Sequence, residues 1–410
     1  MREGLSGMSW DWKAFWNSIR ENSIESIVGL VVLVILGWIL KMAWPQIQNW
    51  IQKRKKKRAE IQNLKKKISA LERRINRAFG AVGKVTEGGE AREGSGLWLT
   101  QPIQKPSNYF MFQRGTCIPI WVFANLKGGV AKTTNATNIA AHFALQGERV
   151  LLLDLDYQAS ASSMGLRDTV RIPGAGQDSR ATRMINGDYK AQELTDEKWT
   201  PLVANDGMVH VTNFRLIPSA YDLAQAENRL MVEWLLAERK NDIRYTLSRI
   251  LHHDTTQQNF DRIIIDAPPR LTTACVQALC AATHLIIPTI LDKLSAESVA
   301  KFIEQVARLK SADVCPHIEV GAIIGYRSGL ATAQIPVTED SIFRALKDAG
   351  LSEDLYRSNE LVPHKPLLAE SAGSVIAVLR NDKPQETQAV QEIFQALATS
   401  IEDRINRYAS

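Results

Sequence analysis

The apolar positions near the start of the chain form one long run. Residues 27–40 include no charged or strongly polar side chain, and the run extends from Ile24 to Trp44 if Glu25 and Lys41 reach back to the interfaces. These 21 residues, at about 1.5 Å each, match about 30 Å of hydrocarbon. We therefore expect a transmembrane helix over residues 24–44. The alternatives are a buried core helix and a signal peptide, and the latter is disfavoured because the charges follow the apolar run.

A heptad pattern follows this run. Its two core positions favour isoleucine and leucine, which is typical of parallel two-stranded coiled coils. We expect a coiled coil over residues 45–79 that pairs best from Ile61 to Ala78, with a lone solvated helix as the alternative. Seven of the ten core positions are large and apolar, the ten being Ile47, Trp50, Arg54, Lys57, Ile61, Leu64, Ile68, Leu71, Ile75 and Ala78.

Charge is concentrated in the same segment. The chain has a net charge of +6 and a pI near 9.0, but residues 51–80 alone carry twelve Lys or Arg and two Glu. The other 380 residues therefore sum to −4. The positive-inside rule places residues 45 onward in the cytoplasm and the tail 1–23 outside, where it can form an amphipathic surface helix. For the run from Lys53 to Arg58 we favour contact with anionic lipid over plain solvation or nucleic acid.

Glycine marks the next boundary. Six of the seventeen residues from Gly80 to Gly96 are glycine, and no apolar period is present. We expect a flexible linker there, followed by an aromatic-rich segment that docks on the next domain. Residues 80–116 thus form a linker and docking segment.

From residue 117 to 410, short apolar runs alternate with helical stretches. This alternation predicts an α/β fold, a mostly parallel sheet with helices on both faces. Four cysteines without metal-like spacing indicate a reducing compartment. The expected strands cover residues 118–124, 150–154, 215–218, 262–266, 284–288 and 320–324, and the expected helices cover residues 132–146, 223–238, 242–252, 272–282, 295–309, 341–349 and 385–408.

The first of these strands leads directly into a glycine-rich turn, Asn125 to Thr134. Such a turn between a strand and a helix lets backbone N–H groups surround phosphates, aided by the helix N-terminus. Lys132 would then reach the β- and γ-phosphates, and the Thr133 hydroxyl would ligate Mg²⁺.

This turn resembles the deviant Walker A motif of the ParA/MinD family of ATPases, in which an early lysine precedes the glycines. The resemblance implies that Lys127 reaches across a two-fold ATP sandwich to the phosphates of the partner chain. One position departs from the motif, since Ala131 replaces a glycine. A Cβ restricts positive φ, so we expect ATP binding to survive and the hydrolysis rate to be affected. The implied phosphate-binding residues are Lys127, Gly128, Gly129, Val130, Ala131, Lys132, Thr133 and Thr134.

Two further strand ends are similar to motifs of that family. Residues 150–158 match its first switch, although Tyr157 replaces the usual proline. There the resemblance implies that Asp156 orients the attacking water and that Asp154 supports the metal. Residues 260–269 match the Walker B strand and second switch, in which Asp266 would hold Mg²⁺ through water.

The sequence therefore suggests a membrane-anchored ATPase that binds Mg-ATP and switches by dimerisation to position or control a partner protein, as a signalling or defence module. The expected setting is the bacterial inner membrane, crossed once, with a homodimer or higher oligomer formed by the coiled coil and the ATP sandwich. The main alternative is a nucleotide-binding scaffold with little turnover. A membrane-anchored tyrosine kinase is disfavoured because only Tyr408 lies near the C-terminus. Direct nucleic-acid binding by the head is not expected, because its late arginines are interspersed with acids.

Overall fold

The chain forms two units, Met1–Ile75 and Asn76–Ser410, which are treated separately below. The amphipathic helix expected around Trp12 and Trp16 lies mostly outside the described residues. The computed structural model describes residues 11, 13–14, 17, 24–87, 96–107, 109, 117–174, 176–237, 241–326 and 335–408.

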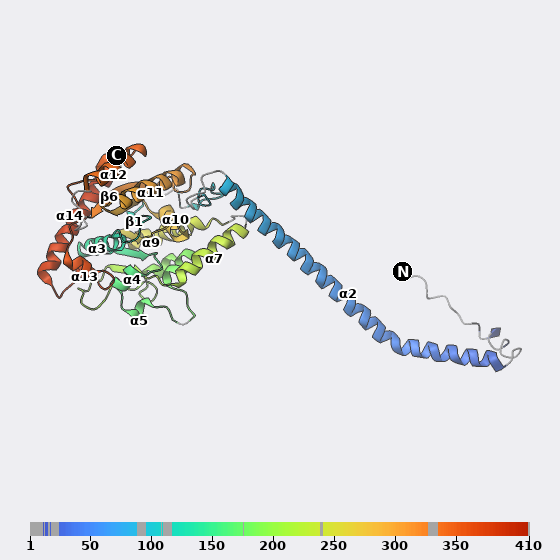
Figure 1. The fold of residues 1–410 in the computed structure, drawn as a ribbon. Coiled ribbons are helices and arrows are strands. Elements are labelled where there is room, and N and C mark those ends of the chain that lie inside the picture. Colours follow the sequence, from blue (N-terminus) through green and yellow to red (C-terminus); the bar gives the residue numbers. More distant parts are fainter. Residues whose placement is uncertain are drawn as a thin grey trace. The chain divides into compact units, whose positions relative to one another are not determined.

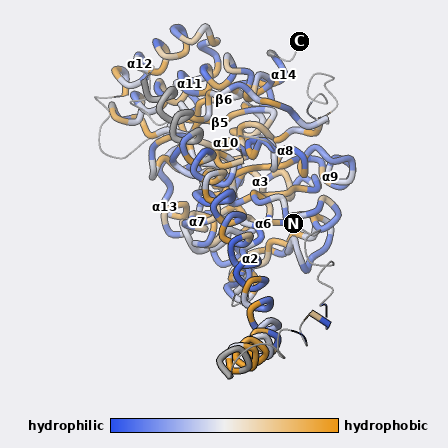
Figure 2. Tube along the Cα trace, turned by 90° about the vertical axis from the view of Figure 1, so that its right-hand side faces the viewer, coloured by the Kyte–Doolittle hydropathy of each residue, from blue (hydrophilic) through white to orange (hydrophobic). Residues whose placement is uncertain are grey.

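Helix α2 (Ile24–Glu87) contains the predicted span and the heptad region without interruption. Among the described residues it is the one helix long and apolar enough to cross a membrane, and Figure 2 shows its apolar start and hydrophilic continuation. Pro45 lies inside it, and the helix bends along its length (Figure 1). A proline removes one backbone hydrogen bond and clashes with the preceding turn, which accounts for a bend. The heptad residues from Ile61 to Ile75 are exposed.

The end of α2 corrects one prediction. We expected a flexible linker from Gly80, whereas the backbone remains helical to Glu87. Each glycine in a helix costs about 1 kcal/mol relative to alanine, but extending an existing helix avoids the cost of nucleation. Gly80 and Gly83 are therefore tolerated at the end of a long helix. Gly88, Gly89 and Gly94 lie outside the described residues.

The second unit is built on one six-stranded sheet whose order is β3-β2-β4-β1-β5-β6 and whose neighbouring strands all run parallel. All six predicted strands are present, with ends that differ by a few residues from the expected ones. They are β1 (Ile120–Phe123), β2 (Val150–Asp154), β3 (Phe214–Ile217), β4 (Arg262–Asp266), β5 (His284–Ile290) and β6 (Glu319–Tyr326).

Helices cover both faces of this sheet (Figure 1), as the sequence predicted. Alternate residues of β1 show the two faces, because Ile120 and Val122 pack into one apolar core while Trp121 and Phe123 pack into the other. The helices are α3 (Lys132–Leu145), α4 (Ser160–Gly165), α5 (Asp168–Arg171), α6 (Arg180–Asn186), α7 (Asp222–Leu236), α8 (Thr246–Leu251), α9 (Asp254–Asn259), α10 (Thr273–Ala281), α11 (Lys293–Ser311), α12 (Ile335–Asp348), α13 (Pro366–Ser371) and α14 (Pro384–Tyr408), with short 3₁₀ turns η3 (Ala191–Thr195), η4 (Ile243–Tyr245), η6 (Glu353–Leu355) and η7 (Ala377–Leu379).

The aromatic-rich segment before β1 was expected to dock on this domain. Trp98 and Tyr109 are buried in the core that also contains α7, α8 and α10. The Tyr109 hydroxyl donates a hydrogen bond to the Val314 carbonyl at 3.1 Å. This segment is therefore part of the folded domain.

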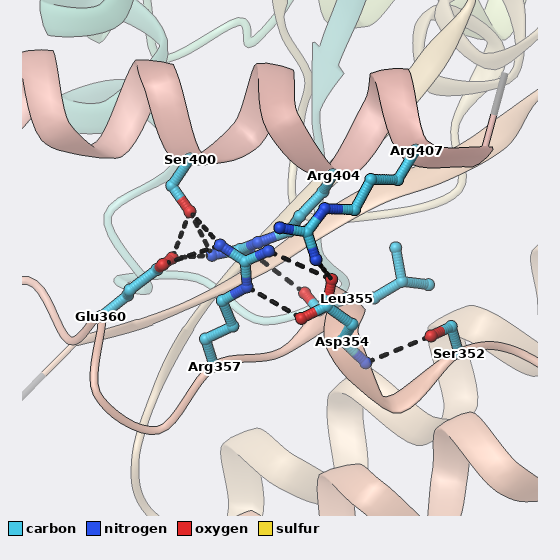
Figure 3. Close-up of polar contacts among 8 residues, drawn as sticks. All are labelled: Ser352, Asp354, Leu355, Arg357, Glu360, Ser400, Arg404 and Arg407. Atoms are coloured by element: carbon cyan, nitrogen blue, oxygen red, sulfur yellow. Dashed lines mark hydrogen bonds and ion pairs between the residues drawn. The ribbon is translucent and has the colours of Figure 1, made fainter.

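An ion-pair cluster attaches the C-terminal helix α14 to the chain around η6 (Figure 3). Arg357 contacts Asp354 and Glu360, each at 2.9 Å. From α14, Arg404 pairs with Glu360 and Arg407 pairs with Asp354. Three late arginines of the head, Arg357, Arg404 and Arg407, are thus engaged by carboxylates within the domain.

Candidate functional site

The turn between β1 and α3 has the backbone of a phosphate-binding loop. Gly129 and Ala131 both have positive φ, 72° and 62°. Ala131 is in the left-handed region, where a Cβ is unfavourable, directly before the first residue of α3. No side chain caps α3, so its first N–H groups remain available as donors for an anion.

Lys132 lies at the start of α3, directly after this turn. Its side chain is buried, and its ammonium donates to the Lys127 carbonyl at 3.0 Å. Burial lowers the pKa of Lys132, and the charges of Asp266 and Asp156 oppose that shift. A buried ammonium held at the loop is suited to phosphate, because a phosphate would compensate its charge.

The two strand-end aspartates meet because β2 and β4 are parallel neighbours with Asp154 opposite Asp266. Asp154 accepts hydrogen bonds from the Ser162 N–H at 2.8 Å, the Ser162 hydroxyl at 2.7 Å and the Asp156 N–H at 3.1 Å. Burial raises the pKa of Asp154 to about 7, against these hydrogen bonds. Its carboxylate therefore fixes the backbone that carries Asp156.

Asp266 is buried in a different way. Neither of its carboxylate oxygens has a hydrogen bond of good geometry among the described residues, although the Thr133 hydroxyl lies close enough to affect its pKa. Burial and the charge of Asp154 raise its pKa well above the usual value, while the Thr133 hydroxyl and Lys132 oppose the shift. A buried carboxylate without a partner is costly, and a cation beside Thr133 would remove that cost.

These residues fit a divalent cation that takes its other ligands from phosphate and water. No group of three or more His, Cys, Asp or Glu side chains able to hold a metal occurs in the described part of the chain. A Mg²⁺ bound through one carboxylate and one hydroxyl, with substrate phosphates, is the common arrangement in nucleotide enzymes.

A cavity of about 720 Å³ adjoins the loop. Of the predicted residues, those from Gly128 to Thr134 and Asp156 line it, whereas Lys127, Asp154 and Asp266 do not. The sequence did not predict the residues that line the rest of the cavity, because they match no local motif. They include Met164, Ile290, Tyr326, Pro363, His364, Lys365, Leu368, Ala369, Ala372 and Gly373.

Lys127 points toward another element. Its ammonium contacts the carboxylate of Asp292 at 3.0 and 3.2 Å and the Ser295 hydroxyl at 2.7 Å. Burial raises the pKa of Asp292, but hydrogen bonds from Ser295 and Lys127 outweigh it and hold the pKa below its usual value. Asp292 also caps α11 by accepting from the Ser295 N–H.

Comparison with known proteins locates this site within a family. Residues 118–320 match the model of an AAA domain. The chain is 34% identical over 178 residues to the chromosome-partitioning ATPase Soj of Thermus thermophilus, which is 43% of this chain and 57% of Soj. It is 32% identical over 190 residues to the same protein from Treponema pallidum, covering 46% and 64%. The chain thus spans less than two thirds of these two relatives.

Solved structures with a similar fold were also found. One is pNOB8 ParA bound to nonspecific DNA, with 17% identity and a TM-score of 0.49, covering 71% of this chain and 99% of that one. Another is cobyrinic acid a,c-diamide synthase from Mycobacterium smegmatis with an ATP analogue and magnesium, with 26% identity and a TM-score of 0.43, covering 56% and 82%.

Proposed function

Because the chain belongs to the ParA/MinD family of P-loop ATPases, we propose that it binds Mg-ATP and hydrolyses it while anchored in a membrane. The observation that carries this proposal is the loop itself. The uncapped start of α3 and the buried Lys132 line one cavity, and the buried carboxylate of Asp266 lies beside Thr133, which lines the same cavity. Each of these groups is stabilised by a magnesium–phosphate ligand.

In this proposal each residue has a separate role in ATP hydrolysis, the transfer of the γ-phosphoryl group to water. The loop N–H groups and Lys132 hold the β- and γ-phosphates, and Asp156, which lines the cavity, orients the attacking water. Thr133 and Asp266 hold Mg²⁺, which neutralises phosphate charge when bound. Asp154 keeps Asp156 in position through the hydrogen bond from the Asp156 N–H.

Lys127 acts between chains. In the single chain its ammonium is held by Asp292 and Ser295, and we propose that it leaves them to contact phosphate on a second copy when two ATP-loaded heads close. The heptad of α2 then supports this dimer, because tethered heads meet at a much higher effective concentration than free ones.

The first part of α2 provides the anchor, with the head on the cytoplasmic side and the run from Lys53 to Arg58 near anionic lipid. A relative of this chain is named for chromosome partitioning. In this protein, permanent anchoring would prevent ATP from controlling attachment. We therefore propose a fixed platform or an ATP-gated module that positions or controls a partner protein.

The test uses the full chain in vesicles. Lys127→Ala and Asp156→Ala should each impair either ATP-dependent approach of labelled heads or phosphate release, with Lys347→Ala and Asp348→Ala, on the exposed end of α12, as matched controls. Unchanged head approach and turnover in both site variants would contradict the proposal. Copurification from membranes would then identify the partner.

A scaffold without turnover is the second candidate, favoured by Ala131 at a left-handed position of the loop. Steady-state phosphate release separates the two functions. A scaffold binds ATP and closes its heads without releasing phosphate above the level of an Asp156→Ala variant.

A further inference from the structure

The docking segment, residues 96–107 with Tyr109, touches the loop that follows Asp266. The Trp98 indole N–H donates to the Leu271 carbonyl at 3.1 Å. Leu271 lies two residues after Pro269, which lines the phosphate cavity. One side chain therefore connects the docking segment to the loop of residues 267–272, of which Pro269 lines the phosphate cavity.

Trp98 is held rigidly at this contact. Its ring stacks on Trp234 of α7, with centroids 6.0 Å apart and planes 11° apart. Arg244 donates to the carbonyls of Trp98 at 2.8 Å and Thr100 at 2.6 Å. Arg244 is itself buried and bound by the carboxylate of Asp242. Both the ring and the backbone of Trp98 are therefore held by contacts within the domain.

The same helix, α7, holds the other end of the loop. The carboxylate of Glu227, on α7, accepts from the Ala274 N–H at 2.8 Å, and the Thr273 hydroxyl donates to the Glu227 carbonyl at 3.2 Å. Both contacts lie at the start of α10, directly after residue 272. The loop is thus fixed by α7 on one side and by Trp98 on the other.

Helix α7 also approaches the first switch. Tyr221, which precedes α7, lies 6.4 Å from the ring of Tyr157, the neighbour of Asp156. Loops that carry Asp156 and Asp266 therefore both contact elements that pack on Trp98. A change in the loop after Asp266 on nucleotide binding therefore alters a group in direct contact with the docking segment.

We propose that Trp98 transmits the nucleotide state of loop 267–272 to the docking segment, residues 96–107. The inference rests on the proposed ATP switch but needs no turnover. In this proposal, loop 267–272 has one arrangement with nucleotide and another without it. The hydrogen bond from Trp98 to Leu271 makes the free energy of residues 96–107 differ between these two arrangements. Nucleotide binding at the cavity and the arrangement of residues 96–107 would thus be coupled in both directions.

Hydrogen exchange on the full chain in vesicles tests this coupling, with a non-hydrolysable ATP analogue and Mg²⁺ as the probe. In the wild type, the analogue should change exchange in residues 96–107 as well as in residues 267–275. Trp98→Phe keeps an aromatic ring beside Trp234 and removes the N–H donor together with part of the indole ring. It should keep the response at 267–275 and reduce the response at 96–107 by about fivefold, the equivalent of one lost hydrogen bond.

Tyr109→Phe is the matched control, because it removes a hydrogen bond from the same segment to the Val314 carbonyl, away from the loop. It should leave both responses unchanged. If Trp98→Phe lowers the melting temperature so far that it does not fold, Trp234→Phe, which weakens the stacking instead, gives the second measurement. An undiminished response at 96–107 in the folded variant, or no wild-type response there, overturns the inference. Failure of the proposed function appears separately, as absent analogue binding or absent phosphate release.

Discussion

Ala131 sits where the loop requires a left-handed backbone, with φ of 62°. An L-residue there costs about 1–2 kcal/mol, while glycine costs about 0.4–1 kcal/mol more in unfolded-chain entropy. Ala131→Gly should therefore leave the free energy of unfolding unchanged or raise it by up to about 1.6 kcal/mol. Removing the Cβ also lets phosphate approach the backbone, so phosphate release should become faster.

The control for this substitution is Ala159→Gly, because Ala159 also has positive φ, 55°, but lies outside the phosphate loop. Both variants relieve the same kind of strain, so thermal unfolding should respond alike. Only Ala131→Gly should change the rate of phosphate release. Equal rates in both variants and the wild type would show that Ala131 does not limit turnover.

Asp266 gives a second prediction at the residue scale, through its dependence on pH. Its pKa is raised in the folded state by burial and by Asp154. The folded protein then binds a proton more tightly than the unfolded chain, so this group's contribution to stability is complete below pH about 4 and is lost as pH rises toward its folded pKa. Asparagine does not ionise, so Asp266→Asn removes this loss of folding stability at higher pH. The variant should become progressively more stable than the wild type as pH increases above about 4.

Urea unfolding across this pH range, with and without Mg²⁺-nucleotide, measures the effect. With the ligand bound, the wild-type carboxylate is compensated, so the advantage of Asp266→Asn should disappear and the variant should bind Mg²⁺-nucleotide weakly. A difference in free energy of unfolding between the wild type and Asp266→Asn that does not change with pH would contradict a raised pKa for Asp266.

At the scale of elements, α11 and the phosphate loop share one ion pair. Asp292 caps α11 and also holds Lys127, and both side chains are about one third exposed. Such a pair contributes at most about 1 kcal/mol, so releasing Lys127 should lower the ATP concentration for head closure by no more than about fivefold. Asp292→Asn should do this while keeping the cap. The concentration of ATP at half-maximal head approach is the measurement.

Asp292→Ala separates the two roles of this side chain. It frees Lys127 and also removes the cap, which costs about 0.5–2 kcal/mol of stability. Easier closure in both variants, with a lower melting temperature in the alanine variant alone, is the expected pattern. Closure that becomes harder in Asp292→Asn would mean that Asp292 assists Lys127 instead of restraining it.

The elements also show what the sequence could predict. The loop from Gly128 to Thr134 was predictable, because phosphate binding needs particular residues in consecutive positions, and the strands were predictable from their apolar runs. The contact of Lys127 with Asp292, 165 residues apart, and that of Trp98 with Leu271, 173 residues apart, follow from packing across the domain. No local pattern encodes such contacts. The linker prediction was based on the number of glycines after Gly80. It did not take into account that a long helix before Gly80 favours its own continuation.

At the scale of the whole molecule, the proposed dimer would combine a seam along α2 with the closure of two heads. The exposed apolar side chains of Ile61, Leu64, Ile68, Leu71 and Ile75 follow the heptad. If a second copy of the chain covers them, the heads remain tethered even without ATP, and their local concentration is then on the order of millimolar.

Ile68→Asn combined with Leu71→Asn tests this arrangement by placing polar groups in the seam. Head approach at saturating ATP should then depend on protein density in the vesicle, requiring a density on the order of 100-fold higher than the wild type. Ser69→Asn with Ala70→Asn is the matched control, since it introduces the same residues into the same helical turn but outside the seam. Asparagine lowers helix propensity in both double variants. The two variants therefore differ only in whether the coiled-coil seam can still pair. Energy transfer between labelled heads, titrated against the lipid-to-protein ratio, measures the difference, and identical titrations for the two double variants would mean that ATP alone brings the heads together.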